Sequence, residues 1–166
     1  MHIYKYYAIY KIIIFFLMFF FVLNTLQPTN EFGEIFLINL ERRTDRLQRF
    51  LKGYNSSDLK GNNITKFHAV DGSKVNMRTV PITDIAALEL KQLETTGFRY
   101  KHYQLTKGAI GCYLSHVRVW ERIMQSNQER ALIFEDDASI PPNCGLEMKK
   151  AMQHIPDDWD IIVFGK

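Results

Sequence analysis

Three consecutive carboxylates, Glu135, Asp136 and Asp137, follow an apolar run in the segment ALIFEDDASI. Like charges about 4 Å apart repel by on the order of 4 kcal/mol at an effective dielectric near 20, so we expect a positive group beside them. Three interpretations fit this spacing. The acids bind a divalent cation that carries a phosphorylated substrate, they form a carboxylate pair for acid–base chemistry, or they cap the next helix and face solvent.

Arginines gather after an earlier apolar run, in the segment NLERRTDR. Arg42, Arg43 and Arg46 lie at the start of a predicted helix. Guanidinium groups and free helix N–H groups both favour anions, so a phosphate site is one interpretation. A basic helix face paired with Glu41 and Asp45 is the other.

A third segment, KGAIGCYLSH, places two glycines early in a predicted helix. Glycine costs about 1 kcal/mol relative to alanine inside a helix, so Gly108 and Gly111 indicate a close approach of backbone to something else. His116 is equally well explained as a core histidine or as part of a site. Ser115 and His116 are neighbours that point about 100° apart on a helix, which excludes a catalytic dyad between them.

These residues need a scaffold, and the hydrophobic pattern predicts one. Apolar runs predict buried strands at 34–40, 64–70, 131–134 and 158–164. Predicted helices follow caps or first-turn signals at Thr44, Thr83, Thr106 and Asn143, and the second of them stops near Gly97. The predicted buried face of the third helix comprises Ile110, Tyr113, Leu114, Val117, Trp120 and Met124.

Strands that alternate with helices predict an α/β fold with a largely parallel sheet. In such sheets ligands gather where strands end at their carboxyl side. The acidic triplet occupies that position after the strand at 131–134.

The N-terminal segment differs in composition from the rest of the chain. Residues 1–26 contain a long apolar run without a small-residue cleavage site, and we expect an uncleaved signal anchor, followed by a short stem at 27–33. Lys5 and Lys11 precede the run or interrupt its start, whereas acidic residues follow it. The positive-inside rule therefore predicts a single-pass membrane protein with a cytosolic N-terminus and a lumenal or extracytoplasmic domain. A cleaved signal peptide and a buried core helix are the alternatives.

Charge and cysteine content exclude some classes of protein. The net charge is +3, and two of the basic residues lie in the N-terminal segment, so the remainder is nearly neutral and carries no footprint for nucleic acid. Cys112 and Cys144 are too few for a disulfide framework. We expect two buried free thiols rather than a disulfide.

Five segments together resemble glycosyltransferase family 25, which includes galactosyltransferases of lipopolysaccharide biosynthesis and procollagen galactosyltransferases. The segments appear in the order and at the spacing of that family. They are IFLINLERRTDRLQRF, FHAVDG, LTKGAIGCYLSHVRVWERI, ALIFEDDASI and WDIIVFG.

The resemblance implies a GT-A-like, Rossmann-type domain over residues 34–166 and a nucleotide-sugar donor, such as a UDP-hexose. It implies that Glu135, Asp136 and Asp137 contact Mn²⁺ or Mg²⁺ and the donor diphosphate. The donor-binding residues that it implies are Asn39, Leu40, Arg42, Asp71, Gly72, Gly108, Gly111, Ser115 and His116.

We therefore expect a metal-assisted transfer of a hexose, such as galactose, to a hydroxyl of a glycan, a lipid-linked acceptor or a protein. Domains of the family usually continue beyond the last matching segment, so we expect the domain to be incomplete at its C-terminus and assign no catalytic base. The alternative is a non-catalytic remnant that binds a nucleotide sugar or a partner. A metal-dependent phosphohydrolase is a weaker alternative, because the chain offers no matching set of a nucleophilic aspartate, an acid and further ligands.

Overall fold

A computed structural model describes residues 32–101 and 104–164. In chain order, the elements are β1 (Glu34–Asn39), α2 (Thr44–Asn55), β2 (Ile64–His68), the 3₁₀ turns η1 (Gly72–Lys74) and η2 (Met77–Thr79), α3 (Asp84–Thr96), α4 (Lys107–Met124), β3 (Ala131–Glu135) and α5 (Cys144–Met152).

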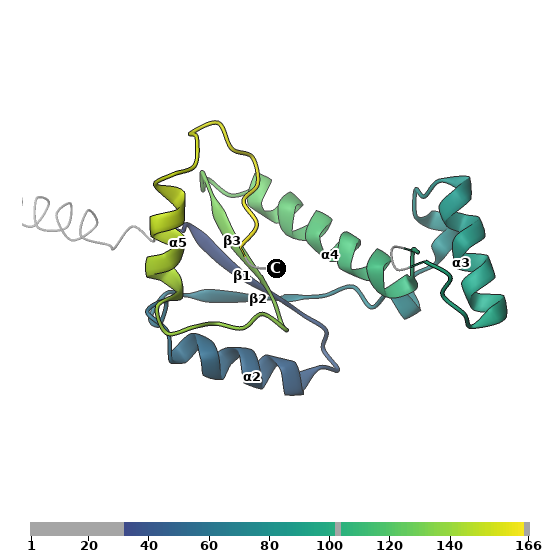
Figure 1. The fold of residues 1–166 in the computed structure, drawn as a ribbon, viewed down its shortest axis with the longest axis horizontal. Helices are drawn as coiled ribbons and strands as arrows, with labels where there is room; N and C mark the ends of the chain where they lie inside the picture. The colour runs from purple at the N-terminus through teal and green to yellow at the C-terminus, as the bar shows by residue number, and fades with distance from the viewer. Residues whose placement is uncertain (1–31, 102–103, 165–166) are drawn as a thin grey trace, which may run out of the picture. The chain divides into compact units, whose positions relative to one another are not determined.

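The three strands form one parallel sheet in the order β2-β1-β3. This confirms the predicted α/β fold with a parallel sheet, and Figure 1 shows the strands between α2 and α4. The fourth predicted strand, at 158–164, is wrong, since this segment has no strand structure. Ile161 and Val163 are 69% and 83% exposed. A run of β-forming residues becomes a strand only where a neighbouring strand and a buried face receive it.

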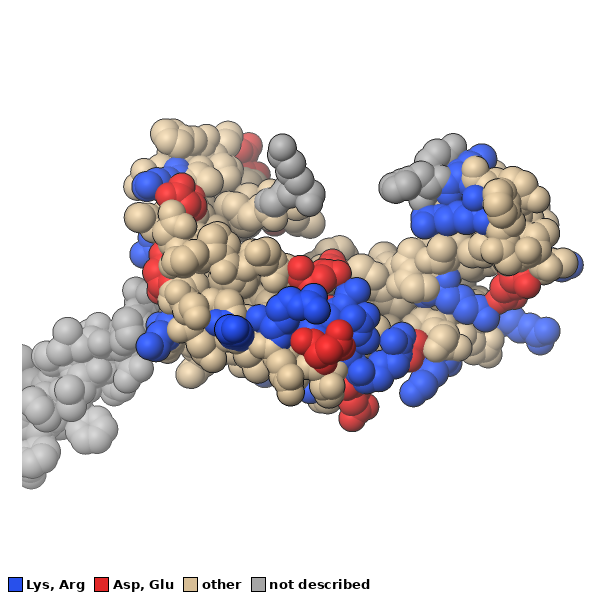
Figure 2. Space-filling model, turned by 60° about the horizontal axis from the view of Figure 1, so that its bottom comes forward, with Lys and Arg blue, Asp and Glu red and all other residues tan. Residues whose placement is uncertain are grey.

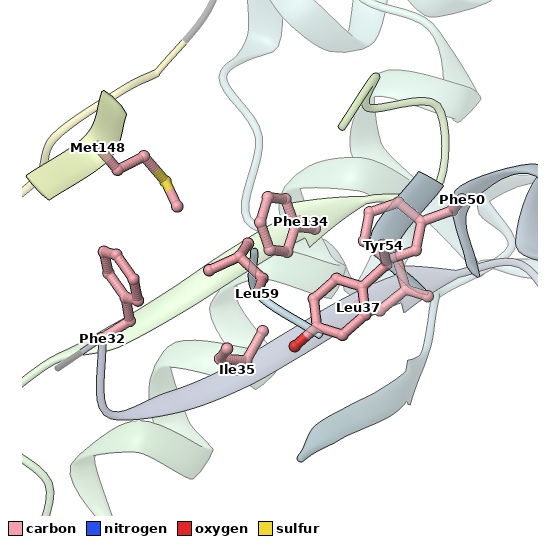
Figure 3. Close-up of a cluster of buried hydrophobic side chains, with 8 residues drawn as sticks. All are labelled: Phe32, Ile35, Leu37, Phe50, Tyr54, Leu59, Phe134 and Met148. Carbon is pink, nitrogen blue, oxygen red and sulfur yellow. The ribbon is translucent and has the colours of Figure 1, made fainter. Parts of the chain in front are cut away.

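The core forms because β1 is apolar on both of its faces. Ile35 and Leu37 pack with side chains of α2 and α5 in one cluster, which Figure 3 shows. Phe36 and Ile38 point to the opposite face and pack against Val119 of α4. The continuous apolar run in the sequence therefore reflects a strand covered by helices on both sides.

Aromatic rings fill the first of these clusters. Phe50 and Tyr54, one turn apart on α2, stack with ring centroids 5.9 Å apart, and Phe134 of β3 lies 5.3 Å from Phe50. Figure 3 shows the three rings together, with Phe32 and Met148 at the other end of the cluster. This packing fixes α2 against the strand that carries the acidic triplet.

Local signals predict some helix ends correctly. Thr83 and Thr106 accept hydrogen bonds at the starts of α3 and α4, and Gly97 ends α3 with φ +67°. One predicted cap is wrong, and another is correct in position only. Thr44 is the first residue of α2 rather than its cap, and Asn143 makes no capping hydrogen bond to α5.

The buried face of α4 differs from the predicted one. Residues Ile110, Gly111, Ser115 and Val119 are buried. Tyr113, Trp120 and Met124, which were predicted to be buried, are 53%, 41% and 76% exposed. Small residues occupy the inner face of this helix because it lies close to the backbone that follows β2, so the hydrophobic spacing alone predicts the wrong rotation.

Both described cysteines are free thiols, as predicted. The prediction that both are buried is wrong, because Cys112 is exposed and Cys144 is only half-buried. The predicted anchor at 1–26 and nearly all of the stem lie outside the described residues. In 32–101 and 104–164, no helix is long and apolar enough to cross a membrane.

Candidate functional site

The carboxyl ends of β1 and β3 lie side by side because Ile38 pairs with Glu135 in the parallel register. The residues that follow this pair along the chain, Asn39 and Asp136, are in buried contact. Asn39 Nδ2 donates to Asp136 Oδ2 at 2.8 Å and to the Arg43 carbonyl at 3.1 Å. Asn39 is 1% exposed, and its Oδ1 atom has no hydrogen-bond partner among the described residues. Asn39 thus ties the two strand ends together and leaves one buried acceptor unpaired.

Arg46 of α2 is the positive group that the acidic triplet requires. Its Nη1 atom donates to Asp136 Oδ1 at 3.1 Å and to Asp137 Oδ2 at 3.0 Å. Asp136 is buried, and both of its oxygens are hydrogen-bonded, whereas the Asp137 side chain is 55% exposed and only its Oδ2 is hydrogen-bonded within the described residues. Asp136 therefore has a mainly structural position, and the Asp137 carboxylate is the more accessible of the two.

The other two arginines pair with different acids. Arg43 makes a two-point contact with Asp45, both bonds at 2.9 Å. The side-chain hydrogen bond from Arg43 holds the pKa of the Asp45 carboxyl well below its usual range. Arg42 Nε donates to Asp71 Oδ2 at 3.3 Å, and the Arg42 side chain is 62% exposed. The basic-face interpretation therefore holds for Arg43, while Arg42 remains exposed beside the carboxyl end of β2.

Glu135 points to a different partner from the two aspartates that follow it. Its Oε1 atom lies 3.1 Å from His116 Nε2 and 3.8 Å from Cys112 Sγ, both on α4. Partial burial, and then the charge of Glu135, raise the pKa of the Cys112 thiol. The triplet is thus divided between α4 on one side and Arg46 on the other.

Asp71 and Gly72 form the turn after β2. Asp71 accepts hydrogen bonds from Ser73 N at 3.1 Å and from Ser73 Oγ at 2.7 Å, and these bonds lower the pKa of the Asp71 carboxyl. A Cβ on Gly72 would overlap the carbonyl of Lys107. This turn and the start of α4 are therefore in direct backbone contact.

The glycine and serine residues of α4 have structural positions. A Cβ on Gly111 would lie 2.5 Å from the Val70 carbonyl oxygen, whereas one on Gly108 would make only an ordinary van der Waals contact, with Thr106 Oγ1 at 3.7 Å. Ser115 is fully buried, accepts from Val70 N at 2.8 Å and donates to the Gly111 carbonyl at 2.6 Å. The prediction of close backbone approach is confirmed for Gly111 and is wrong for Gly108.

An open pocket of about 740 Å³ lies beside this junction. Of the predicted donor-binding residues, Leu40, Arg42 and Asp71 line it. Asn39, Gly72, Gly108, Gly111, Ser115 and His116 do not line it, and neither does the acidic triplet. The pocket is therefore a neighbour of the carboxylate cluster rather than the same feature.

Two cationic pocket residues, Lys74 and Arg118, were not predicted from the sequence. Arg118 lies one turn after Leu114 on α4, and both line the pocket. Once the structure places Leu114 in the pocket, helical spacing identifies Arg118 as a second lining residue. Lys74 ends the turn that Asp71 caps. Figure 2 shows basic side chains grouped around acidic ones on one face of the molecule.

Comparison with known proteins shows which family the chain belongs to. The sequence profile of "Glycosyltransferase family 25 (LPS biosynthesis protein)" matches residues 32–164. The chain belongs to glycosyltransferase family 25.

Several curated family 25 proteins are similar to the chain. It is 33% identical to procollagen galactosyltransferase 2 of Homo sapiens over 138 residues. This alignment covers 81% of this chain and 21% of that protein. It is 32% identical over 151 residues to a glycosyltransferase 25 family member of Anopheles gambiae, covering 88% and 24%. The human inactive glycosyltransferase 25 family member 3 is 31% identical over 140 residues, covering 81% and 22%.

The chain therefore spans about a fifth of the length of these relatives, and the relatives of similar identity include both a named transferase and a named inactive member. No solved structure matches the chain significantly.

Proposed function

We propose that this chain is the donor-binding part of a GT-A-like, metal-assisted glycosyltransferase. It moves a hexose, such as galactose, from a nucleotide diphosphate to an acceptor hydroxyl on a glycan, a lipid-linked acceptor or a protein. The observation that supports this proposal is found at the carboxyl ends of the strands, where Asp137 is exposed after β3 and a pocket lined by Arg42, Lys74 and Arg118 lies after β1 and β2.

The charges of the pocket suit a nucleotide diphosphate. Arg42, Lys74 and Arg118 provide three cationic side chains, and all three are exposed residues that a phosphate can reach. Arginine binds phosphate oxygens through a planar fork, and lysine binds them as a point charge. Leu40, Val75 and Val80 supply apolar lining in the same pocket, which suits the flat face of a base.

The residues present also fit a hard divalent cation. Within the described part of the chain, Asp137 Oδ1 has no hydrogen-bond partner, and the buried Asn39 Oδ1 is an unpaired oxygen in the same cluster. Carboxylate and amide oxygens are the ligands that Mn²⁺ and Mg²⁺ prefer. Asp137, with Glu135, would hold the ion, and Asp136 would position them through Asn39 and Arg46. A bound ion supplies Lewis-acid stabilisation of the departing diphosphate.

A donor-turnover assay tests this proposal. The purified chain is incubated with UDP-galactose and Mn²⁺, and release of UDP is measured before and after chelation. We expect chelation to abolish turnover and Asp137→Asn to reduce it at least about tenfold, which corresponds to about 1.4 kcal/mol. Asp157→Asn, at an exposed position outside the site, is the matched control and should behave as the parent chain. Turnover that persists without metal contradicts the role given to Asp137.

A second candidate function is binding of a nucleotide sugar without transfer. The named inactive human relative at 31% identity favours it. Calorimetry with UDP separates the two, because binding without turnover supports this candidate. A folded sample that does not bind UDP contradicts both.

We also propose that residues 1–26 anchor the protein in a membrane with the domain on the lumenal or extracytoplasmic side. The position of Lys5 and Lys11 relative to the apolar run supports this orientation. Protease added outside sealed microsomes tests it, since the domain should be protected until detergent is added.

A further inference from the structure

Cys112, His116 and Glu135 bring three different metal-ligating groups to one point. Cys112 and His116 lie one helical turn apart on the same face of α4, and Glu135 is the last residue of β3. The thiol, the imidazole and the carboxylate each place one ligand atom within 4.8 Å of the other two. Among the described residues, this is the group of three or more such side chains that is close enough to share an ion.

The separations are close to those that a zinc ion requires. Zinc bonds of about 2.3 Å to sulfur and about 2.0–2.2 Å to nitrogen and oxygen imply ligand–ligand distances of roughly 3.3–3.6 Å in a tetrahedron. Here the carboxylate oxygen lies 3.1 Å from the imidazole nitrogen and 3.8 Å from the sulfur. The sulfur and the imidazole nitrogen also lie within 4.8 Å of each other, so side-chain rotation would bring the three atoms to coordination distance.

The ligand types select the ion. A thiolate and an imidazole are softer ligands than carboxylates and favour Zn²⁺ over Mn²⁺ or Mg²⁺. Thiolate and carboxylate charges would balance the two positive charges of the ion. Cys112 and Glu135 are both exposed, so a fourth position faces solvent and suits a water molecule.

An aromatic side chain lies next to the imidazole. Trp120 lies a further turn along α4, and its ring centroid is 6.0 Å from that of His116. This tilted ring contact packs the Trp120 indole beside the imidazole.

We propose that Cys112, His116 and Glu135 form a zinc site that shares Glu135 with the oxygen ligands proposed around Asp137. The site rests on donor geometry alone and does not require the proposed function. Glu135 lies between two kinds of ligand. Its carboxylate contacts the thiol and imidazole on α4, and it immediately precedes the carboxylates of Asp136 and Asp137 in the chain.

Metal titrations of the full chain test the proposal. Zn²⁺ binding is measured by calorimetry, and Co²⁺ is used as a spectroscopic probe, because a cobalt–thiolate bond gives an ultraviolet charge-transfer band. We expect one Zn²⁺ per chain, bound at least about a hundredfold more tightly than Mn²⁺. We expect the cobalt complex to show the thiolate band.

Variants assign the ligands. Cys112→Ser should abolish the cobalt–thiolate band, and Cys112→Ser, His116→Gln and Glu135→Gln should each weaken Zn²⁺ binding at least about tenfold. Cys144→Ser removes the other cysteine, and His68→Gln removes an exposed histidine of β2. Both are matched controls that should retain the band and the affinity. Circular dichroism establishes that each variant is folded.

Two results would overturn the proposal. One is a folded parent chain that binds no Zn²⁺, and the other is Zn²⁺ binding that Cys112→Ser leaves unchanged. Neither result bears on sugar transfer, because UDP binding and Mn²⁺-dependent turnover are measured without zinc. Conversely, Asp137→Asn should lose turnover and keep the cobalt band, so the two proposals fail separately.

Discussion

At the scale of single residues, Asn39 is a buried polar group that joins two strand ends. Its amide joins the ends of β1 and β3 through Asp136 and also holds the Arg43 carbonyl. Because Asn39 is buried, its neighbours cannot obtain compensating hydrogen bonds from water. A small change of chemistry at this position should therefore have a large effect on stability.

Asn39→Asp tests this constraint. The substitution places a second carboxylate at hydrogen-bond distance from Asp136, and we expect it to lower the free energy of unfolding by about 3–5 kcal/mol at neutral pH. Urea denaturation followed by circular dichroism measures the change. Asn63→Asp, at an exposed position, is the control and should change stability by less than about 0.5 kcal/mol. Equal effects of the two substitutions would contradict the importance of the buried contact.

Two glycines of α4 give a second residue-scale prediction. Gly111→Ala forces a methyl group into the backbone that follows β2, and we expect a loss of at least about 2 kcal/mol of stability. The methyl group of Gly108→Ala makes only an ordinary van der Waals contact, with Thr106 Oγ1 at 3.7 Å, so this substitution should stabilise the protein by about 0.5–1 kcal/mol, because alanine is the better helix former. Thermal unfolding of both variants measures the contrast. Stabilisation by both would mean that α4 does not lie against the turn at Gly72.

The residues of the acidic triplet show how far the sequence predicts this site. Their position after a buried strand follows from the apolar run, and the need for a positive partner follows from Coulomb repulsion. Their division could not be predicted, because it depends on which elements flank β3. Glu135 meets α4, which precedes β3 in the chain, and Asp136 meets Arg46, which is 90 residues away.

At the scale of elements, helix ends divide into those with local and those with distant caps. The caps at Thr83 and Thr106 lie next to their helices, so a local pattern predicts them. The start of α5 is different, since Asp58 Oδ1 and Oδ2 accept from Gly145 N at 2.7 Å and from Leu146 N at 2.8 Å. Asn143 holds the expected cap position and donates to Glu147 instead. No local pattern can predict a cap that comes from 87 residues away.

Asp58→Ala should remove this distant cap. We expect it to lower the free energy of unfolding by about 1–2 kcal/mol at pH 7, as typical cap deletions do. Asn143→Ala is the matched control, since Asn143 makes no capping bond, and it should cost less than about 0.5 kcal/mol. Urea denaturation of both variants measures the difference. A larger loss of stability for Asn143→Ala than for Asp58→Ala would contradict the assignment of the cap to Asp58.

The same cap predicts a dependence on pH. Partial burial favours the protonated carboxyl, but the two backbone N–H groups outweigh it and lower the pKa of Asp58 below its ordinary value. A carboxyl whose pKa is lowered by folding stabilises the folded state fully above its unfolded pKa, near 4, and loses that contribution as pH falls through its folded pKa. The stability difference between the parent chain and Asp58→Ala should therefore be constant from about pH 5 to 7 and shrink below about pH 4. A difference that grows on acidification would contradict this.

At the scale of the whole molecule, stability should be unevenly distributed. β1 is hydrogen-bonded on both edges and buried on both faces. α3 has one buried residue, Leu90, while its Ile85 and Leu88 are 72% and 66% exposed. Segments with few buried apolar contacts open without global unfolding.

Hydrogen exchange followed by mass spectrometry measures this distribution. We expect amides of β1 to exchange only through global unfolding and amides of α3 to exchange at least about tenfold faster. Equal protection of both segments would indicate that α3 is held more firmly than its exposed side chains suggest.

The central place of β1 in the sheet also affects how the chain folds during synthesis. β1 emerges from the ribosome before β3, and the pairing of the two strands joins residues that are 97 positions apart. At about 5–20 residues per second, the β3 edge of this very apolar strand waits roughly 5–20 s for its partner. This delay leaves apolar surface and an unpaired strand edge exposed on the nascent polypeptide. Binding by a chaperone, rather than the rate of collapse, should therefore limit the yield of soluble protein.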